Sequence, residues 1–197
     1  FLHQVPDNRQ AVLAMAHLLT SPGIPSIYYG TEQGFDGGAS PGPCHDVFVR
    51  ECMFGGAWGA FGTTGMHFFN PDYVLYREIA AIATIRKEQP ALRYGRHYFR
   101  EVSDDARNFG YAALGWGMLA YSRILDDDEV VVILNLRDTE QANFVTVDMT
   151  LSEPGTLMCD LLHPETTTLV ENRANRACIQ VTLAPHSVAI FTRAKVA

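Results

Sequence analysis

The first half of this chain is organised around a short stretch, residues 23–32, that reads GIPSIYYGTE. Its centre, residues 24–29, is an apolar run between glycines that is rich in isoleucine and tyrosine, which predicts a short buried strand. A helix is predicted just before it, over residues 7–20, where Asp7 can cap the first turn and Gln10 can complete a capping box. A helix, a short turn and a buried strand form the αβ unit of parallel α/β architectures.

Residues 30–65 follow this strand and hold ten of the 16 glycines, which predicts a long irregular loop. Loops of this length in compact domains are usually functional, and in a parallel barrel the loops after the strands form the active face. A second helix is expected to begin at Asn70-Pro71 and to end before Pro90. Its expected buried face consists of Leu75, Ile79, Ile82 and Ala83.

From about Tyr98 onward the pattern changes from helical to extended, and turn residues separate many short β-rich segments. Such spacing predicts an antiparallel β-sandwich. The acidic run at residues 126–129 is expected to be a solvated hairpin tip rather than a calcium site. The predicted strands are 98–102, 118–124, 130–136, 143–149, 156–161, 167–171, 178–183 and 187–192.

Composition excludes several classes of protein. The chain has 197 residues, 47% of them hydrophobic, and a formal net charge of -7, so it can bury a core but offers no basic surface for nucleic acid. No apolar run is long enough for a membrane span, and no signal-peptide pattern is present. The chain opens with Phe1, so we expect it to be part of a longer polypeptide.

The four cysteines do not match a zinc site, and no metal site is predicted. Free buried thiols are expected, while a Cys44–Cys52 bridge and a Cys159–Cys178 bridge remain open alternatives. The sequence leaves the cellular compartment open.

Three motifs resemble the α-amylase family of glycoside hydrolases. Residues 23–32 resemble its last-barrel-strand motif, residues 85–95 (IRKEQPALRYG) are similar to the segment that closes the barrel, and residues 130–136 (VVVILNL) resemble a core strand of its sandwich. The implied fold class is α/β plus all-β. Residues 1–95 would be the last helix–strand–helix portion of a (β/α)8 TIM barrel, and residues 96–197 a C-terminal antiparallel β-sandwich domain.

The resemblance implies cleavage of α-glycosidic bonds with retention, which needs two carboxyl groups roughly 5–5.5 Å apart. In the family these groups lie on earlier barrel strands, so no catalytic residue is expected in this chain. Two placements of the N-terminus are possible. Either Gln4-Val5-Pro6 replaces the family's Asn-His-Asp motif, or Phe1 follows that motif directly; the second fits better because Asp7 then caps the helix.

The resemblance also points to two substrate-binding residues. The family's loop after the eighth strand carries an Asp and an Arg with three residues between them, and Asp46 and Arg50 offer that pair here. A carboxylate and a guanidinium together satisfy the donors and acceptors of a sugar diol. A salt bridge that only organises the loop is the alternative. Trp58 and Phe61 could stack on sugar rings or pin the loop to the barrel.

The sequence therefore predicts the C-terminal portion of a retaining α-glycosidase or α-amylase-type enzyme acting on α-glucans or α-glucosides. It would form one wall of the substrate cleft, and the isolated chain would be inactive. A non-catalytic carbohydrate-binding or scaffolding piece is the alternative. The expected partners are the glucan and the missing N-terminal barrel segment, with no nucleic acid and no membrane. No cofactor is expected in the chain itself, and Ca²⁺ in the parent enzyme stays open.

Overall fold

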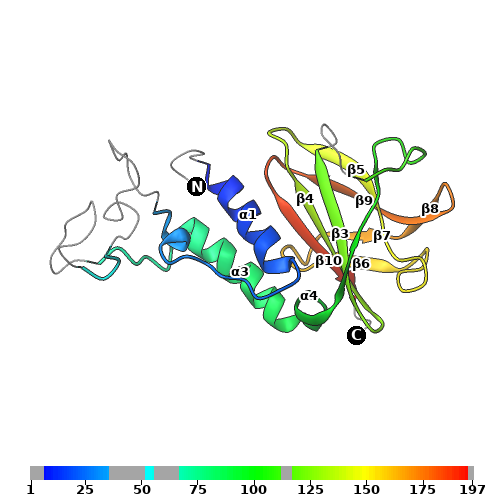
Figure 1. Cartoon of the computed structure of the whole chain (residues 1–197). Coiled ribbons are helices and arrows are strands. Elements are labelled where there is room, and N and C mark those ends of the chain that lie inside the picture. The colour runs from blue at the N-terminus through cyan, green and yellow to red at the C-terminus, as the bar shows by residue number, and fades with distance from the viewer. Residues whose placement is uncertain (1–6, 36–51, 56–66, 112–116, 195–197) are drawn as a thin grey trace.

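The computed structural model of this chain describes residues 7–35, 52–55, 67–111 and 117–194. The elements form three layers: helices on one side, a six-stranded sheet in the middle and a four-stranded sheet on the other side (Figure 1). No helix among these residues is both long enough and apolar enough to cross a membrane.

The predicted first helix is confirmed, but its capping box is not. Asp7 caps α1, and its side chain accepts a hydrogen bond from the backbone N–H of Arg9 at 2.9 Å. The Gln10 side chain instead faces His186, with 3.2 Å between Nε2 of each residue. The helical elements are α1 (Asn8–Thr20), the 3₁₀ turn η1 (Thr31–Gln33), α3 (Val74–Glu88) and α4 (Pro90–Tyr94).

The second predicted helix begins later than expected because Asn70 holds a turn in place of a helix cap. Its side-chain oxygen accepts a hydrogen bond from the Asp72 N–H at 2.9 Å, and α3 starts only at Val74. Ile85 completes the buried face in place of Ala83, which is exposed.

The strands form two sheets in which every pair is antiparallel, as expected for the sandwich. The six-stranded sheet has the order β1-β3-β4-β10-β6-β7, and the four-stranded sheet the order β2-β5-β9-β8. Two predicted strands, 98–102 and 167–171, are each divided between the two sheets. The strands are β1 (Arg96–Phe99), β2 (Val102–Ser103), β3 (Met118–Leu125), β4 (Asp128–Asn135), β5 (Gln141–Thr146), β6 (Leu157–Asp160), β7 (Thr167–Leu169), β8 (Glu171–Arg173), β9 (Arg176–Leu183) and β10 (Val188–Arg193).

Strand β4 lies at the centre of the molecule and is buried on both faces. Val130, Val132 and Leu134 belong to the hydrophobic cluster shared with the helices, whereas Val131 and Ile133 belong to the cluster between the two sheets. This double burial explains why the strand is a continuous apolar run without the alternation of a half-exposed strand.

The prediction of a buried strand at residues 24–29 is wrong. The segment is irregular in the structure, and Ile24 is 98% exposed and Tyr28 56% exposed. A buried parallel strand needs neighbouring strands for its backbone hydrogen bonds and for both faces. Every strand of the described residues lies in one of the two antiparallel sheets, so this segment has no strand beside it.

The acidic run at residues 126–129 is only partly the solvated tip that we expected. Asp126 and Asp127 are exposed at the turn between β3 and β4, but Glu129 is fully buried. Its carboxylate accepts hydrogen bonds from Ser122 Oγ at 2.6 Å and from Arg100 at 2.8 Å, so the last residue of the run belongs to the core.

Cys159 and Cys178 are free thiols, which rules out the bridge between them. Cys159 lies in the six-stranded sheet and Cys178 in the four-stranded sheet. Cys52 is also free, but only Cys178 is buried as expected, because Cys52 and Cys159 are half-buried; Cys44 lies outside the described residues.

Candidate functional site

The predicted substrate-binding residues Asp46 and Arg50 lie outside the described residues, as do Trp58 and Phe61. Residues 1–6, on which the two placements of the N-terminus depend, lie outside them too. The structure does describe the start of the glycine-rich stretch that carries the pair, residues 30–35, and the residues that follow the stretch, from His67 onward.

The first end is a compact turn, residues 30–35, built on two glycines with positive φ. Gly30 has φ of 85°, and a Cβ at this position would collide with the Phe35 ring. Gly34 has φ of 71°, and its Cβ would lie 2.8 Å from the hydroxyl of Tyr73. Both positions therefore need glycine, for the backbone conformation and for the space.

Hydrogen bonds tie this turn to the residues that precede α3. The Asn70 N–H donates to Gln33 Oε1 at 2.7 Å, and Gln33 Nε2 donates back to the Asn70 carbonyl at 3.3 Å. The Phe68 N–H donates to the Met53 carbonyl at 2.7 Å. The start of the glycine-rich stretch and the residues that follow it thus lie close together near α3, on the side of the helices away from the sandwich (Figure 1).

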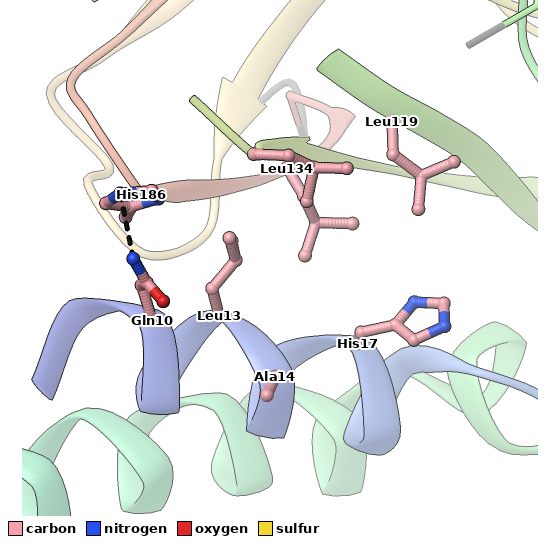
Figure 2. Close-up of a pocket in the computed structure, with 8 residues that line it drawn as sticks. Gln10, Leu13, Ala14, His17, Leu119, Leu134 and His186 are labelled. Carbon is pink, nitrogen blue, oxygen red and sulfur yellow. Dashed lines mark hydrogen bonds between the residues drawn. The ribbon is translucent and has the colours of Figure 1, made fainter. Parts of the chain in front are cut away.

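A groove lies between α1 and the six-stranded sheet and has a volume of about 350 Å³ (Figure 2). Leu13 on α1 faces Leu119 and Leu134 on the sheet across the groove, and His17 and His186 lie at its ends. Among the described residues that line it, none carries a carboxylate.

Buried Arg123 joins the helices to the sheet, and half-buried Arg86 joins α3 to the end of α1; the sequence indicated Arg86 only as a cation in the last turn of its helix. Arg123 on β3 donates to the carbonyls of Thr20 at 2.6 Å and Gly95 at 2.8 Å, and Arg86 on α3 donates to that of Leu19 at 2.6 Å. Burial lowers the pKa of both guanidinium groups. Cations suit the carbonyl ends of helices, so this junction stabilises the packing of α1 on the sandwich. The sequence signal for Arg123 was a charged residue inside an apolar strand.

Among the described residues, no group of three His, Cys, Asp or Glu side chains could hold a metal ion.

No protein-family profile matches the chain. Individual proteins do match it. The beta/alpha-amylase of Paenibacillus polymyxa is 30% identical over 184 residues, which cover 93% of this chain and 12% of that protein. The cyclomaltodextrin glucanotransferase of Bacillus sp. (strain 1011) is 26% identical over 187 residues, which cover 94% of this chain and 22% of that protein. The chain belongs to the α-amylase family.

Solved structures of this family share the fold. The α-amylase from Geobacillus thermoleovorans, complexed with acarbose, superposes with a TM-score of 0.64 at 19% identity and covers 96% of this chain. The cyclomaltodextrin glucanotransferase CldA superposes with a TM-score of 0.65 at 22% identity and covers 99%. The match spans 34% of each of those two chains, and 12% and 22% of the two curated relatives.

Proposed function

We propose that this α-amylase-family chain is the C-terminal portion of a retaining enzyme acting on α-glucans or α-glucosides, and that it forms one wall of the cleft without supplying the catalytic carboxylates. The observation that carries this is a match over nearly the whole chain to relatives named amylases and cyclomaltodextrin glucanotransferases, of which the chain spans only a small part. Solved relatives were complexed with acarbose and with maltotriose.

We propose further that residues 1–95 belong to the end of a (β/α)8 barrel and residues 96–197 to the sandwich domain. The exposed segment at residues 24–29 supports this, because an apolar run with Ile24 98% exposed and Ile27 37% exposed is costly in water. Contact with the remainder of a longer polypeptide would bury this apolar run.

Asp46 and Arg50 are the residues that we propose for substrate binding. Their support is the resemblance, together with the turn at residues 30–35, whose hydrogen bonds to Asn70 bring the start of the glycine-rich stretch close to the residues that follow it. A carboxylate and a guanidinium offer both an acceptor and donors to neighbouring sugar hydroxyls.

The first test measures the binding of maltoheptaose to the 197-residue chain by two-dimensional NMR. We expect Asp46→Ala to weaken binding at this site about 10- to 100-fold, the loss of one charged hydrogen bond. Asp127→Ala, which removes an exposed carboxylate at the β3–β4 turn, is the matched control and should change nothing. Equal affinities of the two variants would refute the role of Asp46.

Hydrolysis is the second test. Incubated with soluble starch, the chain alone should release no reducing ends, since the catalytic carboxylates are proposed to lie elsewhere. The natural protein should have an intact mass more than twice 21.8 kDa under denaturing conditions. Starch hydrolysis by the purified chain would overturn the proposal, and would instead require a carboxyl pair within it.

A non-catalytic carbohydrate-binding piece stays the alternative. It predicts that Asp46→Ala leaves glucan binding unchanged. It also predicts that the natural protein hydrolyses no starch, whatever its intact mass.

A further inference from the structure

Strand β1 carries a histidine, His97, in an unusual setting. Its ring stacks on Tyr121 of β3 with the centroids 4.5 Å apart, and Phe99 meets it edge-on at 4.9 Å. The Nδ1 atom of His97 is buried and has no hydrogen-bond partner among the described residues. Because a buried polar atom without a partner costs free energy, the ring does more here than fill space.

The charges that act on His97 are positive or become positive in acid. Arg123 lies directly opposite His97 in the register of β1 and β3, and it is 1% exposed. His17 acts on His97 from α1. The other titratable groups around this cluster are Arg86 on α3, Arg93 on α4, and Tyr98, Arg100 and Tyr111, which line the hollow that His97 borders.

Arg123 holds the helices on the six-stranded sheet. Its guanidinium donates to the carbonyls of Thr20 at 2.6 Å, Leu92 at 2.9 Å and Gly95 at 2.8 Å. Among the described residues, no carboxylate forms an ion pair with Arg123. A second cation beside Arg123 would therefore meet repulsion that no adjacent carboxylate of these residues offsets.

Protonation of His97 would change this junction in two ways. A neutral imidazole can keep Nδ1 free of a proton, whereas the protonated ring carries an N–H on both nitrogens and leaves a buried donor without an acceptor. The new charge would also lie beside Arg123. Burial and the charge of Arg123 lower the pKa of His97, so the folded chain holds this proton less tightly than the unfolded chain. The residue is half-buried and borders a hollow of about 480 Å³, so water can deliver the proton.

We infer that His97 makes the packing of α1 on the six-stranded sheet acid-sensitive: protonation of its ring weakens the contact of Arg123 with the helix ends, while the two sheets stay packed. The cluster between the sheets consists of apolar side chains and contains no histidine. The contribution of neutral His97 to stability is complete above the ordinary pKa of histidine, about 6.5, and is lost as pH falls below that value. The inference concerns the chain itself and does not rest on the proposed function.

The test is hydrogen exchange of the full chain, followed by NMR at about pH 7.5 and about pH 5.5 and corrected for the intrinsic pH dependence of exchange. It compares the protection of α1 amides with that of β9 amides, because β9 belongs to the four-stranded sheet beyond the six-stranded one (Figure 1). We expect the ratio of α1 to β9 protection to fall about 3- to 10-fold at the lower pH. His97→Phe keeps a ring that cannot be protonated and should hold the ratio constant. His67→Asn, which removes an exposed histidine ahead of α3, is the matched control and should behave as the wild type does.

A second measurement decides the matter if His97→Phe fails to fold. The ring protons of His97 in the wild type should titrate with a pKa below 6.5, and the loss of α1 protection should follow the same curve. The inference is overturned if the ratio is the same at both pH values, or if it falls equally in His97→Phe. A fall that persists in His97→Phe but disappears in His17→Phe would assign the sensitivity to His17 and overturn it too. So would a pKa of His97 at or above 6.5, because attraction of the protonated ring to Tyr121 would then outweigh its burial.

Discussion

Glu129 is the residue whose removal should destabilise the sandwich most clearly. Its carboxylate is fully buried and accepts hydrogen bonds from Arg100 at 2.8 Å, Ser122 Oγ at 2.6 Å, Ser152 Oγ at 2.7 Å and the backbone N–H of Asp148 at 3.0 Å. Breaking a buried ion pair by removing one partner costs about 3–5 kcal/mol. We therefore expect Glu129→Ala to lower the free energy of unfolding by an amount within that range.

The structure places the value at the lower end, about 3 kcal/mol, because Arg100 keeps a second carboxylate, Asp148, at 3.7 Å. Glu129→Gln keeps the shape and should cost less than Glu129→Ala. Asp128→Asn is the matched control: its side chain is 77% exposed and lies 3.7 Å from Arg193, so the change should stay within about 0.5 kcal/mol. Urea unfolding followed by circular dichroism measures all three. If Glu129→Ala differed from Asp128→Asn by less than 1 kcal/mol, the buried network would not stabilise the fold as described.

Two further predictions concern pH and backbone conformation. Burial raises the pKa of Asp160, whose carboxylate accepts a hydrogen bond from the Ile190 N–H at 3.0 Å, so the native state holds this proton more tightly than the unfolded chain. That stability is present at low pH and is lost as pH rises above about 4. Asp160→Asn should therefore gain stability relative to the wild type between pH 4 and 7. Urea titrations that gave the same difference in unfolding free energy between variant and wild type at every pH would contradict this. Gly30→Ala should cost about 1–2 kcal/mol for its positive φ, plus the displacement of Phe35. Gly23→Ala, with φ of 108° and nothing within 4 Å of its Cβ, is the control for strain alone, and equal losses in the two variants would show that the Phe35 contact is unimportant.

Local sequence patterns predicted most of the elements. Asp7 followed by a helical apolar stripe located α1, and Pro90 located the end of α3. The apolar run at residues 130–136 located β4, because a strand buried on both faces needs apolar side chains at every position. These features depend on neighbours in the chain, which a sequence displays directly.

The candidate site was predictable only in part. The resemblance pointed to Asp46 and Arg50, and their role stays a prediction because it depends on residues outside the described ranges. The acid-sensitive junction gave no distinctive pattern, because His97 and Arg123 are distant in sequence and meet only through the pairing of β1 with β3.

The sequence by itself determined the helical stripes, the strand-rich second half and the family, because periodicity, turn residues and motifs are local properties. Tertiary structure alone decided which residues each strand meets. It left residues 24–29 exposed for want of neighbouring strands, and it buried Glu129 from an acidic run that looked solvated, because Arg100 and Ser122 lie within hydrogen-bonding distance. A charge is stable in a core only when distant residues supply its partners, and no local pattern records where those partners will lie.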